Sequence, residues 1–211
     1  MKIIHISDTH SHIIKNMPEA DLLVHSGDAT LNGGPRELRT FNFWLESIRH
    51  KYKEIIFVPG NHDRLFEEDE AAARSVVTAA RVLIDEAYEF EGFKIYGTPY
   101  TPAFFQWAFM KFRGEEMRHV WNKVPLDTNI LISHGPPRNI LDECYQDGRI
   151  KFVGCDDMLK RIEELKDLKL CMFGHIHPAY GKMFKNGVTY SNGSTTGPFG
   201  MSFNAPLEIV L

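Results

Sequence analysis

Short apolar runs recur along the sequence, and each ends at serine, glycine or proline-glycine. Each run is a few residues long and apolar at nearly every position, which is typical of strands buried on both faces of a sheet. The runs are Ile3–Ile6, Leu22–His25, Ile55–Val58, Ile130–Ile132 and Leu170–Phe173. The pattern therefore predicts a sheet of short, fully buried strands.

Helical patterns lie between these runs. Apolar residues spaced three and four positions apart share one face of a helix. They occur at Leu38, Phe41, Trp44, Leu45 and Ile48, and again at Leu159, Ile162, Leu165 and Leu168. This alternation of strands and helices predicts an α/β fold with parallel strand pairs.

Two stretches interrupt that rhythm. Residues 82–100 are short and strand-like, with Gly92 and Gly97 as punctuation, and segments 187–191 and 207–211 alternate like hairpin strands. They predict a second sheet, at least partly antiparallel, packed on the first. The 211 residues are 43% hydrophobic and 25% charged, which is ordinary globular composition. Without a repeat or linker, a single domain over residues 1–211 is the simplest expectation.

Charge and cysteine content narrow the function classes. The 24 Lys and Arg against 28 Asp and Glu give a net charge of −4, which argues against dedicated binding of duplex nucleic acid. Nucleotides stay possible, because a metal site supplies positive charge locally. The sequence has no apolar stretch near the ~20 residues of a membrane helix, and it opens directly into a motif. The three cysteines have no metal-binding spacing, so we expect free thiols in a soluble, cytoplasmic protein.

Metal-binding side chains follow every apolar run. They lie in Asp8-Thr9-His10, Gly27-Asp28, Gly60-Asn61-His62-Asp63, Ser133-His134-Gly135 and Gly174-His175-Ile176-His177. Carboxylate, imidazole and amide ligands suit Mn, Fe or Zn. Since functional groups gather at the carboxyl ends of strands in α/β sheets, we expect these loops to converge on one crevice, with their strands side by side. His5, His25, His50 and His119 fall outside the loops, and we expect them in the core, in a sheet or on the surface.

The order of these motifs resembles the signature of the calcineurin-like metallophosphoesterase superfamily, which reads D-x-H, GD, GNHD or GNHE, H and GHxH. The match spans Asp8 to His177 without a missing part. The segments Gly97–Pro102 and His134–Pro137, with the short length, are most similar to the MPPED branch and its bacterial relatives. The resemblance implies a four-layer αββα sandwich, with two mixed sheets flanked by helices.

The resemblance also implies a dinuclear site for two divalent ions, with Mn favoured and Fe, Zn or Ni compatible. The first ion's ligands would be Asp8, His10, Asp28 and His177, and the second ion's would be Asn61, His134, His175 and the shared Asp28. A hydroxide held between such ions is a strong nucleophile near neutral pH. His62 would be the general acid that protonates the leaving oxygen, and Asp63 the carboxylate that orients its ring.

The implied substrate is a small phosphoester, foremost a phosphodiester such as a cyclic nucleotide. A phosphomonoesterase or phosphoprotein phosphatase is the alternative within enzymes, and a metal-binding interaction scaffold is the alternative from another class. Oligomeric state stays open. His12, Arg64 and Arg138 are candidates for binding the phosphate, against the alternative of solvated surface residues.

The segment Ala103–Phe112 is apolar around its whole circumference and rich in aromatic rings. One interpretation is a buried helix or a plug between the sheets. The other is a flap near the active site whose aromatic side chains stack on a nucleobase or an aromatic leaving group. The sequence leaves this choice open.

Overall fold

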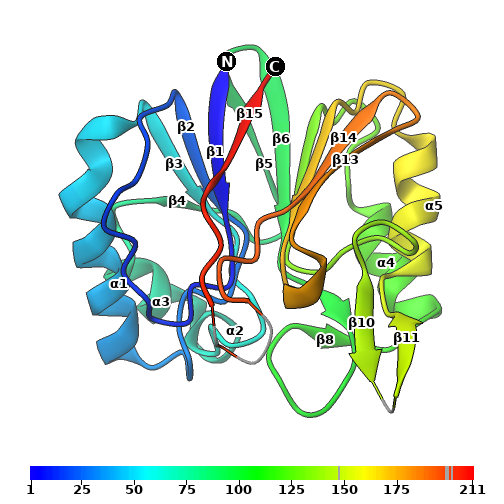
Figure 1. Cartoon of the computed structure of the whole chain (residues 1–211), viewed down its shortest axis with the longest axis horizontal. Coiled ribbons are helices and arrows are strands. Elements are labelled where there is room, and N and C mark those ends of the chain that lie inside the picture. Colours follow the sequence, from blue (N-terminus) through cyan, green and yellow to red (C-terminus); the bar gives the residue numbers. More distant parts are fainter. Residues whose placement is uncertain (147, 198–199, 201) are drawn as a thin grey trace.

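Two β-sheets stand face to face in the computed structural model, and helices cover their outer surfaces (Figure 1). The model describes residues 1–146, 148–197, 200 and 202–211. Both sheets combine parallel and antiparallel pairs. The predicted α/β sandwich with αββα layers is therefore confirmed.

Within the described ranges, the first sheet has five strands and the second has six. In spatial order the first sheet consists of β15 (Leu207–Val210), β1 (Lys2–Ile6), β2 (Leu22–His25), β3 (Glu54–Phe57) and β4 (Arg81–Val82). The second consists of β13 (Gly181–Lys185), β14 (Val188–Asn192), β12 (Leu170–Phe173), β9 (Ile130–Ser133), β6 (Phe93–Thr98) and β5 (Glu86–Phe90). Two small ribbons complete the strands: β7 (Thr101–Pro102) with β8 (Met110–Lys111), and β10 (Glu143–Gln146) with β11 (Arg149–Phe152).

The helices form the two outer layers. The first sheet carries α1 (Pro35–Ile48) and α3 (Glu70–Val76), with α2 (Leu65–Glu68) beside them, and the second carries α4 (Glu115–Asn122) and α5 (Asp156–Glu164) (Figure 1). Short 3-10 turns follow at Arg49–Lys51 and His177–Ala179. Among the described residues, no helix combines the length and apolar character that crossing a membrane requires.

Burial on both faces explains why the central strands are apolar at every position. On β1 and β2, Ile4 and Leu23 pack toward α1, while the alternate residues Ile3 and Leu22 lie in the core between the sheets. Ile132 of β9 reaches the same inter-sheet core from the opposite side. Each such side chain contributes roughly 1.5–3 kcal/mol by leaving water, so this core holds the two sheets together.

The sheet assignment differs from the expectation in two ways. The five apolar runs do not lie side by side in one sheet: β1, β2 and β3 belong to the first sheet, and β9 and β12 belong to the second. The final strand, β15, pairs antiparallel with β1 rather than joining the second sheet. Apolar periodicity reports burial, and both sheets bury their strands equally, so it does not say which sheet a strand joins.

The helical spacing over residues 159–168 also exceeds the observed helix. Helix α5 ends at Glu164, and Leu165 and Leu168 continue in turns while staying buried in the second outer core. Residues in a turn can still pack into the same core as the helix before them. The apolar spacing therefore continues beyond the end of the helix.

The inter-sheet core should be the chief determinant of stability. Ile56 of β3 is 0% exposed there, whereas Val210 of β15 is 72% exposed. We expect Ile56→Ala to lower the free energy of unfolding by about 2–5 kcal/mol because it opens a cavity. The matched change Val210→Ala should alter it by less than about 0.5 kcal/mol. Urea unfolding of both variants checks this, and equal losses would contradict the inter-sheet assignment.

Candidate metal centre

The metal-binding motifs lie on loops at one edge of the sandwich, below the sheets in Figure 1. The first sheet supplies Asp8 and His10 after β1, Asp28 after β2 and Asn61 after β3. The second sheet supplies His134 after β9, and His175 and His177 after β12. A backbone bridge between Ser7 and Ser194 joins the two sides at this edge. The crevice therefore lies between the sheets rather than along one of them.

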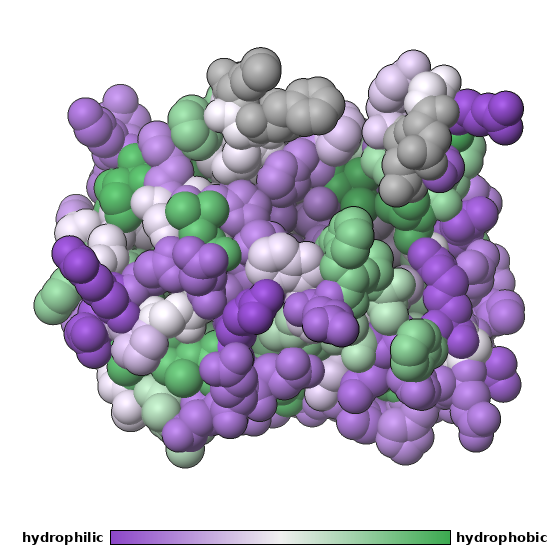
Figure 2. Space-filling model, turned by 90° about the horizontal axis from the view of Figure 1, so that it is seen from below, coloured by the Kyte–Doolittle hydropathy of each residue, from purple (hydrophilic) through white to green (hydrophobic). Residues whose placement is uncertain are grey.

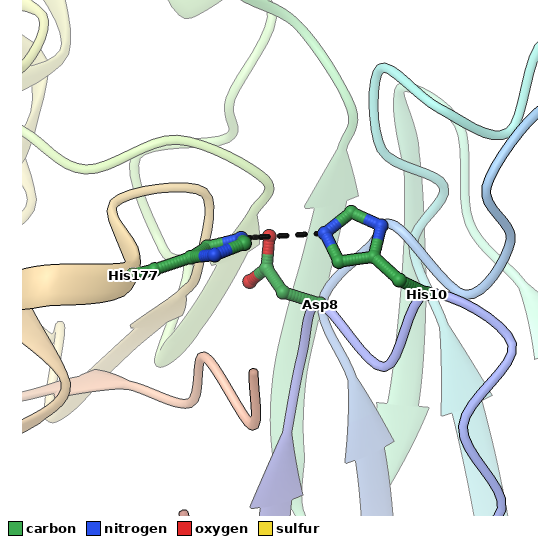
Figure 3. A group of neighbouring side chains, drawn as sticks. All are labelled: Asp8, His10 and His177. Atoms are coloured by element: carbon green, nitrogen blue, oxygen red, sulfur yellow. Dashed lines mark hydrogen bonds and ion pairs between the residues drawn. The ribbon is translucent and has the colours of Figure 1, made fainter. Parts of the chain in front are cut away.

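The first donor cluster consists of Asp8, His10 and His177 (Figure 3). The two imidazole rings approach the Asp8 carboxylate from opposite sides in this view. His177 Nε2 lies 3.3 Å from Asp8 Oδ1 and 3.3 Å from His10 Nε2. Donor atoms around an ion with bonds of about 2.1 Å are separated by about 3.0–3.4 Å, so this spacing fits a cation. Asp8 Oδ1 is buried without a hydrogen-bond partner, which also fits a metal ligand.

The second donor cluster consists of Asp28, His134 and His175, with Asn61 beside it. His134 Nε2 lies 2.9 Å from Asn61 Oδ1, 3.2 Å from His175 Nδ1 and 3.3 Å from Asp28 Oδ1. These separations again equal the edges of a coordination polyhedron. The donor set therefore fits a second cation without rearrangement.

The Asp28 carboxylate stands between the clusters. Its Oδ1 faces His134, whereas its Oδ2 lies 4.0 Å from His10 Nε2 and 3.9 Å from His62 Nε2. The backbone N–H of His62 donates to Oδ1 at 2.8 Å and fixes the carboxylate's orientation. One oxygen is thus available to each cluster, which is the arrangement a bridging ligand requires.

Backbone carbonyls set which ring nitrogen is free to bind metal. His134 Nδ1 lies 3.0 Å from the Ser26 carbonyl oxygen, and His10 Nδ1 lies 3.3 Å from that of Thr30. A carbonyl oxygen only accepts hydrogen bonds, so Nδ1 carries the hydrogen in both rings. The lone pair at Nε2 then points into the crevice, as in most histidine ligands of metals.

Electrostatics favour anionic carboxylates in the crevice. Burial disfavours ionisation of Asp28, yet the charge on His134 outweighs it and lowers the pKa of Asp28 to about 2. Burial likewise opposes a charged His134, but Asp28 raises the pKa of His134 to about 9. Burial lowers the pKa of His175 to about 3, so that ring is neutral. A cation bound here displaces the proton of His134, because a ligand imidazole must be neutral.

Several of the predicted ligands lie on left-handed backbone. The φ angles are +52° at Asp8, +43° at His10, +55° at Asp28 and +68° at His175. Aspartate and histidine adopt this region more readily than most residues, although it still costs about 1–3 kcal/mol each. The sharp turns therefore lie at the donor residues themselves, in the loops that follow the strands.

Two glycines allow the loops to approach one another. A Cβ atom at Gly60 would lie 2.3 Å from Asp28 Oδ1, and one at Gly174 would lie 2.1 Å from Asp8 Oδ2. Any side chain at either position would displace a ligand carboxylate. Glycine is therefore required at these positions of the GNHD and GHIH motifs, because the neighbouring carboxylates leave no room for a side chain.

A family model described as calcineurin-like phosphoesterase matches residues 1–179. The chain belongs to this family. It is 34% identical to the human metallophosphoesterase domain-containing protein 1, over 98% of this chain and 69% of that protein. It is 33% identical to the UPF0046 protein K07C11.7 of Caenorhabditis elegans, over 91% of this chain and 69% of that protein. The resemblance drawn from the motifs is confirmed, and the protein is a metal-dependent hydrolase of phosphoric esters.

In this calcineurin-like phosphoesterase, His62 lies at the rim of the first cluster, half-buried. Its Nδ1 is 2.6 Å from the Leu31 carbonyl oxygen, and its Nε2 faces Asp28 Oδ2. The Trp107 ring packs on the His62 ring with centroids 4.1 Å apart. The carbonyl and the indole together hold the imidazole with Nε2 directed toward the crevice.

The hydrogen bonds of Asp63 contradict the orienting role predicted for it. The fully buried carboxylate accepts from the backbone N–H groups of Gly60, Ala29 and Thr30, at 2.8, 3.3 and 3.0 Å, and from the Thr30 hydroxyl at 2.8 Å. The His62 ring takes a different partner, since its Nδ1 bonds to the Leu31 carbonyl. Asp63 instead ties the loop after β2 to the loop after β3.

The predicted phosphate-binding residues lie in three different places. His12 stacks on Phe203, with ring centroids 3.8 Å apart. Arg64 lies over the Trp107 ring, 4.8 Å from its centroid, and so stays near His62. Arg138 is farther from the crevice, where its guanidinium donates to the Phe152 carbonyl and lies 3.9 Å from Asp156. Of the three, only Arg64 contacts a neighbour of His62.

The segment 103–112 is neither a buried helix nor a plug between the sheets. It is a loop followed by β8, and several of its rings are exposed, Phe105 by 85%. Phe104 contacts the ring of His175, with centroids 5.0 Å apart, and Trp107 contacts His62. The backbone N–H of Ala108 donates to the Asn61 carbonyl at 3.3 Å. The loop therefore forms a rim of the metal centre, as the flap interpretation expected.

Two buried residues, one at the end of β14 and one just after it, lie outside the motifs of the sequence. The Ser194 hydroxyl lies 2.9 Å from Asp8 Oδ2 and 2.8 Å from Asn192 Oδ1. The Asn192 side chain also donates to the Ile176 carbonyl at 2.9 Å, next to His177. Small polar residues directly after the strand-like segment 187–191 were the available signal. Both residues position ligands of the first cluster.

Asp28 should control both metal ions at once. We expect Asp28→Asn to lose both ions together, because one carboxylate oxygen serves each cluster, whereas His177→Ala should weaken one ion only. Asp127→Asn, which removes an exposed carboxylate paired with Lys94, is the matched control. Metal content after dialysis, measured by mass spectrometry, checks this. An Asp28→Asn protein that keeps one ion at full occupancy would contradict the prediction that Asp28 bridges the two ions.

Proposed function

We propose that this protein hydrolyses phosphodiesters at a dinuclear centre that takes two divalent cations, Mn²⁺ foremost. The observation that supports this is the pair of donor clusters that share the Asp28 carboxylate, with His62 at their rim. Two cations bound there supply Lewis acidity toward the phosphate and a nucleophile at neutral pH. The ligand set is the one expected from the motifs: Asp8, His10, Asp28, Asn61, His134, His175 and His177.

His62 is the proposed proton donor to the leaving oxygen. The Leu31 carbonyl at 2.6 Å requires a hydrogen on Nδ1, so the proton that moves is the one on Nε2. That nitrogen faces the crevice and lies 3.9 Å from Asp28 Oδ2, within reach of an ester oxygen held between the clusters. Packing against Trp107 limits rotation of the ring and so keeps Nε2 aimed at the substrate.

The proposed substrates are small phosphodiesters, among them nucleotides and cyclic nucleotides. Aromatic side chains at the rim offer stacking surface for a base. We further propose that residues 1–211 act as one metallophosphoesterase domain. A cytoplasmic location is proposed because the thiols of Cys144, Cys155 and Cys171 are unpaired, which suits a reducing compartment.

The first test is metal-dependent turnover. Protein freed of metal by a chelator should be inactive on bis-(p-nitrophenyl) phosphate, and added Mn²⁺ should restore release of p-nitrophenolate. A second chelator treatment should abolish it again. A metal-loaded protein that cleaves only phosphomonoesters would replace the diesterase proposal with a monoesterase. One that cleaves neither class would point to the interaction scaffold.

His62→Ala separates proton donation from metal binding. The variant should retain both metal ions and lose roughly 10²–10⁴-fold in kcat on diesters with poorly leaving alcohols. The loss should be smaller with p-nitrophenolate, which leaves without a proton. His119→Ala removes an exposed histidine on α4 and serves as the control. Loss of a metal ion from His62→Ala, or equal losses on both leaving groups, would contradict the assignment.

A further inference from the structure

A cavity of about 430 Å³ opens beside the second donor cluster. This size lies within the range of sites for small organic ligands. The cavity runs between the aromatic loop at residues 103–105 and the β10–β11 ribbon, and it reaches the metal ligand His175. Its walls include Phe104, Pro136, Cys144, Tyr145 and Val153. The face that carries the crevice shows a run of hydrophobic surface to the right of its middle, among hydrophilic residues (Figure 2).

The cavity walls offer carbon surface rather than free charge. Arg113 also lines the cavity, but its guanidinium donates to the backbone carbonyls of Val153 and Gly154, at 2.5 and 2.7 Å, and lies 3.5 Å from Asp156. Arg113 therefore stabilises the cavity wall through these hydrogen bonds, and Asp156 balances its charge. A phosphate oxygen has no need of such a cavity, whereas an uncharged planar group fits it.

The cavity and the proton donor lie on different flanks of the metal centre. Phe104 touches His175 beside the cavity, whereas Trp107 packs on His62, and His62 is not among the cavity walls. The group that His62 protonates must depart beside His62. The cavity beside His175 is thus available to a different part of the substrate.

We propose that this cavity binds the planar organic group that stays on phosphorus when the other ester bond breaks. The proposal rests on the phosphodiesterase function above. In the reaction, one water loses a proton and its oxygen bonds to phosphorus, the P–O bond to the leaving group breaks, and the leaving oxygen takes the His62 proton. The proton released by the water replaces the one that His62 gave up. The second P–O–C linkage stays intact in the monoester product. A phosphomonoester has no second organic group, so the cavity selects diesters with a retained aromatic or base-like ring.

Three substrates with one leaving group test the proposal. Bis-(p-nitrophenyl), methyl p-nitrophenyl and p-nitrophenyl phosphate all release p-nitrophenolate, and they retain an aryl group, a methyl group or no organic group. We expect Phe104→Ala and Tyr145→Ala to lower kcat/KM about 10-fold for the aryl diester. The methyl diester should lose less than about 3-fold, because it has no ring to stack. The methyl diester corrects for any loss of fold or metal.

Phe112→Ala is the matched control, since this ring is 70% exposed in the same segment and lies outside the cavity walls. It should leave the aryl-to-methyl ratio of kcat/KM unchanged. Equal losses on the two diesters in Phe104→Ala and Tyr145→Ala, or no loss on either, would overturn the cavity assignment and leave the hydrolase proposal intact. No turnover of any ester by the metal-loaded wild type would overturn the proposed function instead.

A binding measurement without turnover tests independently whether the cavity binds a planar organic group. Phenyl(methyl)phosphinate and dimethylphosphinate have no ester bond, so neither can be hydrolysed, and they differ by one ring. Calorimetric titration of metal-loaded protein should give about 10-fold tighter binding of the phenyl compound. The gap should fall below about 3-fold in Phe104→Ala and persist in Phe112→Ala. Equal affinities of wild type for both compounds would contradict the proposal.

Discussion

The contact between Asp28 and His134 is the one on which the rest of the site depends. Asp28 follows β2 of the first sheet, His134 follows β9 of the second, and their side chains meet 3.3 Å apart in a buried crevice. A buried carboxylate requires a countercharge. Although burial opposes a charged ring, Asp28 raises the pKa of His134 to about 9, so a proton on His134 can supply that countercharge. A cation bound there would exchange this proton for a larger positive charge and would keep the two sheets joined at the same point.

The inter-sheet core offsets the backbone strain of the loops that hold the crevice residues. Ligand loops such as that of Asp8 hold left-handed backbone at strand ends, and they approach closely enough that Gly174 admits no side chain. Such turns are unfavourable locally and persist only when the flanking strands are rigid. Strands β1 and β12 supply that rigidity, because every residue of β12 and every residue of β1 except Lys2 is buried. Stability is thus concentrated in the strands, and chemistry in the turns that follow them.

The sequence predicted which side chains gather in the crevice better than it predicted the sheets around them. Asp8 and His177 could be recognised because strand ends and motif order are local features of the chain. The division of the strands between two sheets depends on long-range pairing, which the burial pattern of β9 does not encode. The role of Asp63 depends on the direction of a side chain within a turn. Ser194 lay in a segment without aspartate or histidine, although its hydroxyl lies against Asp8.

The aromatic loop links the two flanks of the metal centre. Its apolar composition was compatible with a buried helix or with a flap, and the observed loop is held by hydrogen bonds from its backbone: Ala108 donates to the Asn61 carbonyl, and Phe109 donates to the Glu67 carboxylate of α2 at 2.9 Å. Between these anchors and β7, one short segment places Phe104 against His175, the proposed metal ligand, and Trp107 against His62, the proposed proton donor. Under the proposed mechanism, a displacement of this loop would therefore alter substrate binding and proton delivery together. The proposed selectivity for the retained group and the orientation of His62 would then both depend on the same packing.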